Sequence, residues 1–445
     1  MCFRRKSKPS PPSFVVPVPV PEPEPIPVPV QDPVLVPEIP VADRSLPVPP
    51  LRPTPPPLPA SLPDLYFIRD VSDLGEAIRS APPNMEIVVT KSGELLSPVV
   101  LLPGSRLRLA QGVVITTRTE GIPFRLMEGT SIIGEPGSVI MESSVAGQFT
   151  VIAGFYGSET NGAADTDITL QGFEVRGSSE RTDTNSAPQA ISLGNCKHFQ
   201  VYGVWVNGTH SIGMQAGGAG FDGYAAEDGI VSHCRFTRVA SQSLALVNGR
   251  RVRFEYNDFD APGQIGGPGS HPIDLETNGS DDVLYDIVIR GNYIDMRGAA
   301  VYGNGMIVQC STGSAEVGEI HIEDNLVIGG NPYEPNLTPL MLSNGIYVFG
   351  ATMRDVTIKG NRIWRTGQSG LNLEGAGIVA TDNELVNVGG GGIPGVVLDL
   401  RASTRESEFS RNTFKWAGEA PCDNRIQMIT STVKMENNSG FAIVE

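Results

Sequence analysis

The chain of 445 residues has 33 basic and 49 acidic residues, and its formal net charge of −16 argues against nucleic-acid binding. No apolar run approaches the roughly 20 residues that a membrane-spanning helix needs. The cysteines are odd in number and lack metal-ligand spacing, so neither a disulfide scaffold nor a zinc site is predicted for Cys2, Cys196, Cys234, Cys310 and Cys422.

Residues 1–63 differ in composition from the rest of the chain. They begin with a basic tip and continue through sequence such as VPVPVPEPEPIPVPV. Proline lacks a backbone N–H and fixes φ, so alternating X-Pro favours an extended polyproline II conformation. We expect a stiff arm or docking strap without a fold of its own. Pro17 interrupts the apolar residues after the basic tip, so no secretory signal peptide is predicted.

A short helix is predicted just after the proline-rich segment. Asp73, with Glu76 three residues later, is typical of a capped helix start, and Leu74, Ala77 and Ile78 then share one face. Such a helix would cover the open end of a solenoid, whose first rung otherwise exposes its core and strand edges. Residues 64–104 are therefore predicted to form a helical cap with the initial strands, and residues 105–445 a solenoid.

Short repeats with an asparagine at a fixed place fill this second part. Segments such as VRFEYNDF, IVIRGNYI and IHIEDNLV alternate apolar and polar residues, as β-strands with one buried face do. The frame extends upstream through Phe173, Val204 and Cys234, with spacings between 22 and 36 residues. We expect parallel strands about 4.8 Å apart. Each asparagine would adopt the left-handed backbone of a tight corner and bond to adjacent rungs. The aligned asparagines are Asn257, Asn292, Asn325, Asn361, Asn383, Asn412 and Asn438.

These repeats resemble the right-handed parallel β-helix of the pectate-lyase-like superfamily, which has an asparagine ladder at such a corner. The resemblance covers about residues 64–445. It implies an all-β, single-stranded parallel β-helix of roughly a dozen rungs. The alternative is an antiparallel β-sandwich with asparagines in unrelated turns.

A second strand precedes each asparagine strand, and its outward residues predict a binding surface. In IDLET, for example, Ile273 and Leu275 are expected to point inward and their alternates outward. Insertions at 208–229, 260–271, 297–304 and 329–344 should form loops beside this floor. The resulting groove suits a long polysaccharide, because sugars pack on aromatic faces and bond to amides and carboxylates. The predicted floor consists of Gln215, Asp274, Glu276, Gln309, Tyr347, Phe349, Asn372, Glu374 and, on the last strand, Asp399 and Arg401.

The sharpest cluster in this floor is an acidic pair flanked by His271 and Asn278, both predicted to bind substrate. Asp274 and Glu276 share the outer face of one strand, with backbones about 6.5 Å apart. That separation suits an inverting glycosidase, in which one carboxyl protonates the leaving oxygen and the other activates water. The nearby run Asp281-Asp282 is expected to raise one of the two pKa values. The alternatives are a calcium site made by the same oxygens, and a solvated acidic face without chemistry. No other cofactor or metal is predicted.

The best-known activities of the superfamily do not carry over residue by residue. Pectate lyases use clustered calcium-binding aspartates and a basic proton acceptor, whereas this floor has Arg401 alone. Polygalacturonases carry Gly-His-Gly and Arg-Ile-Lys motifs, and neither occurs here.

The organisation as a whole resembles a bacteriophage tailspike or fibre: an arm, a β-helix and no export signal. The resemblance implies a virion-associated or extracellular homotrimer that binds a bacterial surface polysaccharide. The arm would hold a virion protein, and hydrolysis at Asp274 and Glu276 is left open. One alternative is a free extracellular carbohydrate-active enzyme of bacterial origin, a glycoside hydrolase or lyase. Another is a purely structural surface or virion protein.

Overall fold

The computed structural model describes residues 52–62, 64–82, 85–143, 150–154, 165–178, 189–218, 225–260, 271–297, 303–310, 316–329, 344–350, 352–388, 398–400, 404–415, 425–428, 433–440 and 442–444. All of these residues belong to one compact unit, Pro47–Glu445. Among them, no helix is long and apolar enough to cross a membrane. The division of the chain at residues 63 and 104 stays a prediction.

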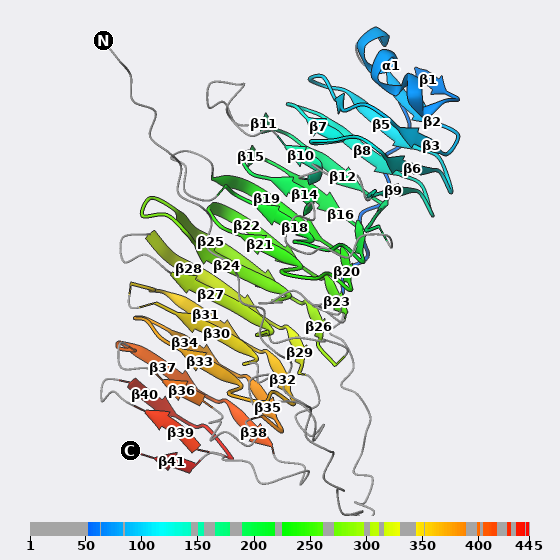
Figure 1. Ribbon diagram of the computed structural model, residues 1–445. Coiled ribbons are helices and arrows are strands. Elements are labelled where there is room, and N and C mark those ends of the chain that lie inside the picture. The colour runs from blue at the N-terminus through cyan, green and yellow to red at the C-terminus, as the bar shows by residue number, and fades with distance from the viewer. Residues whose placement is uncertain are drawn as a thin grey trace, which may run out of the picture. The chain divides into compact units, whose positions relative to one another are not determined.

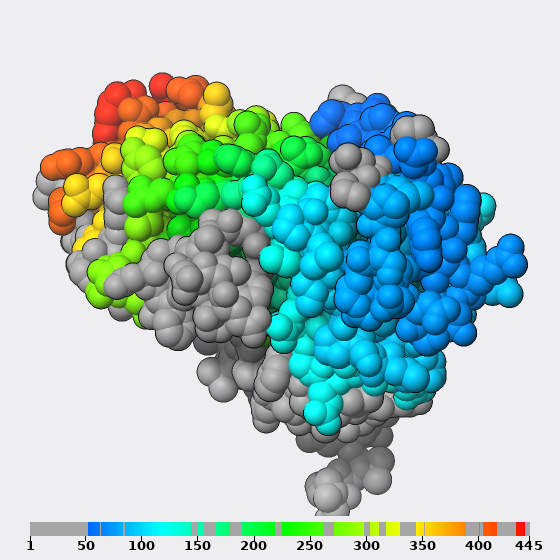
Figure 2. All heavy atoms as spheres, turned by 90° about the horizontal axis from the view of Figure 1, so that it is seen from above, coloured from blue at the N-terminus to red at the C-terminus, as the bar shows by residue number. Residues whose placement is uncertain are grey.

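Three parallel sheets run along the unit, and a typical turn of the chain contributes one strand to each sheet (Figure 1). Every pairing between the described strands is parallel, which excludes the antiparallel sandwich. The colours in the space-filling view change in order from the cap to the C-terminal rungs, so successive rungs are neighbours on the surface (Figure 2). The chain therefore forms the expected right-handed parallel β-helix of roughly a dozen rungs.

Counted over the described residues, as for sheets B and C below, sheet A has 16 strands. It consists of β1 (Leu65–Ile68), β2 (Glu86–Val89), β5 (Arg106–Leu109), β8 (Ser131–Gly134), β12 (Thr169–Gln171), β16 (Gln200–Tyr202), β19 (Ala226–Ser232), β22 (Gly249–Glu255), β25 (Val283–Arg290), β28 (Glu316–Glu323), β31 (Val356–Lys359), β34 (Val379–Thr381), β37 (Ser407–Ser410) and β40 (Val433–Glu436), with β11 (Asp165–Thr166) and β15 (Cys196–Lys197) at its side.

Sheet B has 12 strands. They are β3 (Gly93–Leu95), β6 (Val114–Thr117), β9 (Val139–Met141), β13 (Glu174–Arg176), β17 (Trp205–Asn207), β20 (Arg235–Thr237), β23 (Asp258–Asp260), β26 (Tyr293–Asp295), β29 (Leu326–Ile328), β32 (Arg362–Trp364), β35 (Glu384–Val386) and β38 (Thr413–Lys415).

Sheet C has 13 strands. They are β4 (Val99–Val100), β7 (Phe124–Leu126), β10 (Thr150–Gly154), β14 (Gln189–Leu193), β18 (Met214–Ala216), β21 (Leu244–Leu246), β24 (Ile273–Thr277), β27 (Met306–Cys310), β30 (Ile346–Phe349), β33 (Leu371–Leu373), β36 (Leu398–Leu400), β39 (Arg425–Met428) and β41 (Ala442–Val444). Two strands follow β36, so the prediction that Asp399 lies on the last strand was wrong.

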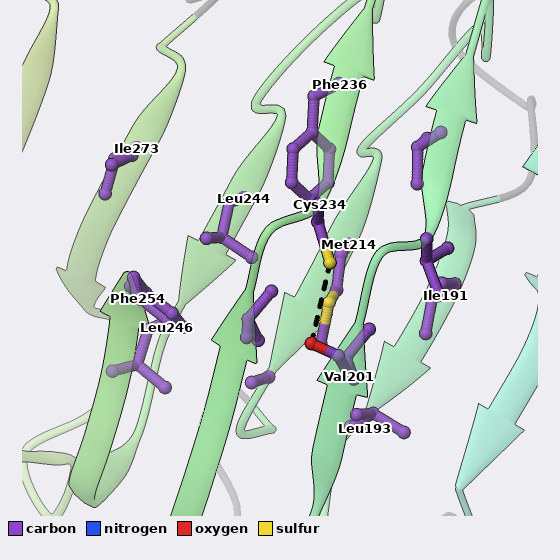
Figure 3. Packing of buried hydrophobic residues seen from close by; sticks show 14 of the residues in the cluster. Ile191, Leu193, Val201, Met214, Cys234, Phe236, Leu244, Leu246, Phe254 and Ile273 are labelled. Carbon is purple, nitrogen blue, oxygen red and sulfur yellow. Dashed lines mark hydrogen bonds between the residues drawn. The ribbon is translucent and has the colours of Figure 1, made fainter. Parts of the chain in front are cut away.

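The core runs along the inside of the three sheets, where side chains of successive rungs stack. Phe236 and Phe259, neighbours in sheet B, have ring centroids 5.0 Å apart and nearly parallel planes. The thiol of Cys234 points inward toward the carbonyl of Val201 at 3.5 Å (Figure 3). Burial raises the pKa of this thiol to about 12. Cys234 is thus a buried solenoid residue, as its place in the repeat predicts.

The asparagine ladder is present at all seven predicted positions, between sheets A and B. Asn257 is typical: its backbone N–H and its side-chain amide both donate to Oδ1 of Asn292, at 2.9 and 3.1 Å. The same amide donates to the carbonyl of Val231, one rung back. Asn292, Asn325, Asn361, Asn383 and Asn412 repeat the pattern down to Asn438.

One detail of the ladder prediction was wrong. The left-handed residue is the one before each asparagine: φ is +57° at Tyr256, +63° at Gly291 and +53° at Asp324. The corner thus turns one residue earlier, and this presents the asparagine amide to the rungs on either side. Hydrogen bonding, and not tolerance of positive φ, explains why asparagine recurs.

The cap consists of a 3₁₀ turn, η1 (Val71–Asp73), and α1 (Leu74–Ser80). As predicted, Leu74, Ala77 and Ile78 are buried. The predicted capping box at Asp73 was wrong, because Asp73 makes no side-chain cap hydrogen bond. The capping residue is instead Asp70, which accepts a hydrogen bond from the N–H of Ser72. The cap lies there because the 3₁₀ turn η1 precedes α1 and begins at Val71.

Candidate functional site

The strand register of sheet C brings most of the predicted floor into two adjacent columns. The first passes through Gln215, Ala245, Asp274, Ile307, Tyr347, Asn372 and Asp399. The second passes through Glu276, Gln309 and Phe349. The alternates Ile273 and Leu275 are fully buried inside, so the inward and outward faces are as predicted.

The first column is less accessible than predicted. Although their side chains face out from the sheet, Gln215 is only 8 % exposed and Asp274 and Asn372 only 4 %. Gln189 on the preceding rung donates to Oε1 of Gln215 at 2.7 Å, and the Gln215 amide turns back to the carbonyl of Gly217. The floor is therefore a closely packed polar layer, and a ligand would meet only parts of it.

Asp274 is the most unusual group in this layer. Its Oδ1 is buried and has no hydrogen-bond partner among the described residues. Burial raises the pKa of its carboxyl to about 7, the negative charge of Glu276 adds to this rise, and a hydrogen bond from the Gln242 side chain opposes it. The prediction that Asp281 and Asp282 raise the pKa of one carboxyl of the pair was wrong, because neither contributes to the raised pKa of Asp274. The carboxylate of Asp282 instead accepts the N–H of Asn278 at 2.8 Å and that of Gly279, which closes a turn.

Glu276 lies two residues from Asp274 on the same face of β24, about 6.5 to 7 Å away along the backbone. It accepts a short hydrogen bond from the side-chain amide of Gln309 on the next rung. This hydrogen bond orients the Glu276 carboxyl on the strand face that it shares with Asp274.

His271 stands just before β24 and forms part of a second polar ladder, which the sequence analysis missed. The N–H of Asn304 donates to Nδ1 of His271 at 2.9 Å, so the remaining proton of the neutral ring is on Nε2. Burial lowers the pKa of His271 to about 4, which keeps the ring neutral near pH 7. On the following rungs, Asn344 donates to Oδ1 of Asn304, and Ser369 N–H to Oδ1 of Asn344.

A sequence signal for this second ladder exists. Asn304, Asn344 and Ser369 are each followed by glycine at the start of a sheet C strand. Glycine is needed because a Cβ at Gly305 would lie 2.5 Å from the Val327 side chain and 2.6 Å from the carbonyl of Gly345. The repeated polar-glycine pair thus marks a close-packed corner.

Two aromatic side chains lie two rungs beyond the acidic pair. Tyr347 and Phe349 have ring centroids 5.7 Å apart at 34°, and Phe349 is 41 % exposed. The columns place Tyr347 two rungs from Asp274 and Phe349 two rungs from Glu276, about 9.6 Å along the sheet. A partly exposed aromatic pair at this distance can support an apolar sugar face.

Of the remaining predicted site features, some lie in the described residues and others do not. Glu374 follows β33 beside this column, half-buried, and its N–H donates to the carbonyl of Val348. The backbone of Asp399 pairs with Asn372, whereas its side chain and all of Arg401 lie outside the described residues. So do most of the predicted wall loops, although 208–229 contains β18 and the first residues of β19.

Metal binding gains no support from the part of the chain that the structure describes, where no three His, Cys, Asp or Glu side chains are grouped to hold an ion.

No protein-family model matches the sequence, and no curated protein matches it. Solved structures do match. The catalytic unit of an α-1,3-glucanase from Streptomyces thermodiastaticus is 15 % identical with a TM-score of 0.54, over 86 % of this chain and 71 % of that one. The surface adhesin PfbA of Streptococcus pneumoniae is 12 % identical with a TM-score of 0.52, over 76 % and 82 %.

The tailspike protein of E. coli bacteriophage HK620, solved in complex with a pentasaccharide, is 14 % identical with a TM-score of 0.50. The match covers 84 % of this chain and 62 % of the tailspike. At such identities the matches show the fold alone. With its three parallel sheets and its asparagine ladder, the chain thus has a right-handed parallel β-helix fold.

Proposed function

We propose that the outer face of sheet C binds a bacterial surface polysaccharide, and that Asp274 and Glu276 hydrolyse it. One observation carries the catalytic part: a buried carboxyl with a pKa raised to about 7 and an oxygen without a hydrogen-bond partner among the described residues, beside a second carboxyl on the same strand face. Two carboxyls in different environments are how glycosidases separate the acid from the base.

In the proposed reaction, Asp274 donates its proton to the glycosidic oxygen as the bond to the anomeric carbon breaks. Glu276 takes a proton from a water molecule, whose oxygen forms the new bond to that carbon. Inverting glycosidases hold their two carboxyl groups about 6.5 to 9.5 Å apart, and the backbones of Asp274 and Glu276 are about 6.5 to 7 Å apart on one strand face, so we expect inversion. The rate should fall as pH rises through about 7, where Asp274 loses its proton.

The fold neighbours support a carbohydrate ligand, since they include a glucanase and a tailspike in complex with a pentasaccharide. We further propose that the protein is virion-associated or extracellular, that its N-terminal segment binds a virion protein, and that it works as a homotrimer. Sedimentation showing a stable monomer would reject the trimer. Normal incorporation of a chain lacking residues 1–46 would reject attachment through that segment.

A second candidate is binding without cleavage. The exposed Phe349 beside Tyr347 favours it, because an aromatic platform needs no catalytic pair. The surface adhesin among the neighbours has the same fold.

The decisive experiment measures reducing-end release from a panel of bacterial surface polysaccharides, with ultraviolet absorbance to detect unsaturated lyase products. We expect release without absorbance from the wild type, and loss of release in Asp274→Asn and in Glu276→Gln. Asp286→Asn, on the outer face of sheet A, is the matched control and should leave release unchanged. Binding without release from any glycan would reject hydrolysis and favour the second candidate.

A further inference from the structure

The described part of the proline-rich segment, residues 52–62, lies along the outer face of sheet A. It runs from β23 back toward the cap, opposite to the direction in which the rungs are built. Seven of its residues form a hydrogen bond or an ion pair with the β-helix: Arg52 with Asp258 (2.7 Å), Pro53 with His233 (2.9 Å), Pro56 and Pro57 with Gln171 (3.2 and 3.1 Å), Pro59 with Arg108 (2.9 Å), Ala60 with Arg106 (2.6 Å) and Leu62 with Glu86 (3.2 Å).

The spacing of these contacts is regular on both sides. The carbonyls of Pro53, Pro56 and Pro59 are three residues apart, and the side chains that donate to them come from the ends of β19, β12 and β5. In sheet A those three strands are separated by β16 and by β8, so the donors lie two rungs apart. Two rungs measure about 9.6 Å, and one turn of polyproline II, three residues at about 3.1 Å, measures about 9.3 Å.

The chemistry of the contacts also matches a proline-rich ligand. Proline has no N–H, so its backbone can only accept hydrogen bonds. The outer face of sheet A presents donors: a guanidinium from Arg108, an amide from Gln171 and a ring N–H from His233, whose Nδ1 contacts the Ser232 hydroxyl. The row of donors on sheet A is therefore complementary to the row of carbonyls in the proline-rich segment.

Residues 52–62, called the strap from here on, also account for buried polar groups on an outward-facing column of sheet A. Arg108 is 4 % exposed, Gln171 5 % and Ser232 2 %, although all three side chains face away from the core. Arg108 donates to the fully buried Glu86, so its charge is paired, and its remaining N–H groups are available to the strap. Such burial of a guanidinium is costly unless its hydrogen bonds are made. The site is therefore built into the sheet.

We propose that the outer face of sheet A is a recognition surface for a polyproline II helix, and that residues 52–62 are its ligand, supplied by the same chain. The surface contacts every third residue of the helix, because one turn of polyproline II is nearly as long as two rungs of the β-helix. In the sequence, Pro47 and Pro50 continue the series of Pro53, Pro56 and Pro59. Along the same column of the sheet, Arg290 and Lys359 stand on β25 and β31, again two rungs apart.

This inference is independent of the proposed function, because it concerns a different face of the β-helix. Sheet A holds the strap, whereas the candidate glycan site lies on sheet C. A partner held through the N-terminal segment and a glycan on sheet C would therefore not compete for the same surface.

The test removes the polyproline II conformation of the strap in the full chain. Replacing Pro55, Pro56 and Pro57 with glycine keeps every backbone carbonyl but removes the fixed φ that holds the carbonyls in a three-residue repeat. Replacing Pro21, Pro23 and Pro25 with glycine is the matched control, because it makes the same change in the proline-rich segment outside residues 52–62. The readout is modification of the His233 ring by diethyl pyrocarbonate, followed by mass spectrometry. His321, also on sheet A but beyond the described strap, is the internal reference.

We expect the glycine variant at Pro55, Pro56 and Pro57 to speed modification of His233 on the order of tenfold, because the hydrogen bonds to the strap are lost. The control variant should keep the wild-type rate, and His321 should not change in either. Equal rates at His233 in the two variants would overturn the proposal.

A second comparison keeps the strap sequence intact. Gln171→Glu keeps the side-chain shape but replaces the donor NH₂ with an oxygen that faces two proline carbonyls. We expect a lower thermal midpoint and faster modification of His233. Gln200→Glu, in the adjacent outward column on β16, is the matched control. If Gln200→Glu changed His233 as much as Gln171→Glu, the donor row would not be what holds the strap.

Discussion

Asp274 and Glu276 stand two residues apart on one face of β24, and the charge of Glu276 adds to the burial that raises the pKa of Asp274 to about 7. The Asp274 carboxyl therefore ionises less readily than an ordinary aspartate. Burial in the packed first column, and not the acidic character of the chain as a whole, is the main cause.

Replacing Asp274 with asparagine should make stability less sensitive to pH. The pKa in the folded protein, about 7, lies above the ordinary value of 3.8, so the folded state binds the proton more tightly than the unfolded state. The free energy of unfolding of the wild type should therefore fall as pH rises from about 4 to about 7. Asn carries no charge, so Asp274→Asn should gain relative stability at pH 8, by at most about 4 kcal/mol.

Urea unfolding at pH 4 and pH 8 measures this effect. At pH 4 the two proteins should differ little, because Asp274 is protonated there. A relative stability of Asp274→Asn that is the same at both pH values would show that the pKa of Asp274 is not raised.

Removing the exposed aromatic ring of the floor should weaken glycan binding. Phe349→Ala should lower affinity by about 1 to 2 kcal/mol, because the sugar face loses its apolar support. Isothermal titration calorimetry measures this affinity, with the polysaccharide that the protein binds or cleaves in the panel described above. Phe67→Ala is the matched control, since Phe67 is 59 % exposed on β1, away from sheet C. Equal losses in the two variants would remove Phe349 from the site.

Truncating one asparagine of the first ladder should destabilise the whole unit. In Asn292→Ala, the buried N–H of Asn257 and the carbonyl of Phe254 lose their partner. A loss on the order of 3 kcal/mol in the free energy of unfolding is expected from two unsatisfied buried groups. Gln200→Ala, exposed on β16, should cost under 0.5 kcal/mol or so. A similar small cost for Asn292→Ala would mean that packing alone holds the rungs.

Asparagine should be tolerated at Cys234, because Cys234 already forms a hydrogen bond with the first asparagine of the ladder, Asn257. The N–H of Cys234 donates to Oδ1 of Asn257, and its thiol points at the carbonyl of Val201, as the ladder amides do one rung back. Cys234→Asn should therefore change stability by about 1 kcal/mol or less. Cys196→Asn puts the same amide in the core beside Gly154 and should cost more than about 2 kcal/mol. Thermal unfolding distinguishes them, and the reverse order would contradict this extension of the ladder.

The strap predicts where the chain can be shortened. A chain that begins at Pro47 keeps every strap contact described above, so its thermal midpoint should equal that of the full chain. A chain that begins at Asp64 uncovers Arg108 and Gln171 and should unfold several degrees lower, as expected for a loss of 1 to 2 kcal/mol or so. Equal midpoints for the two chains would show that the strap does not stabilise the β-helix.

Local periodicity was enough to predict the parallel β-helix, the cap helix and the asparagine positions. A two-residue alternation determines which side chains point inward, and a fixed repeat determines which residues stack on one another. Ile273, Leu275 and the seven asparagines were therefore found without coordinates. The second ladder was available in the same way, through Asn304, Asn344 and the glycine that follows each.

By itself, the sequence determined the fold, which side chains of each strand point inward, and the position of Asp274 and Glu276 on one strand face. All of these follow from spacing along the chain. Only the tertiary structure decided the burial of the outward column, the raised pKa of Asp274 and the docking of residues 52–62. These depend on contacts between residues far apart in sequence, such as Pro53 with His233, 180 positions away. The rung spacing and the polyproline rise are each local properties, but their match across sheet A arises only once the rungs are stacked.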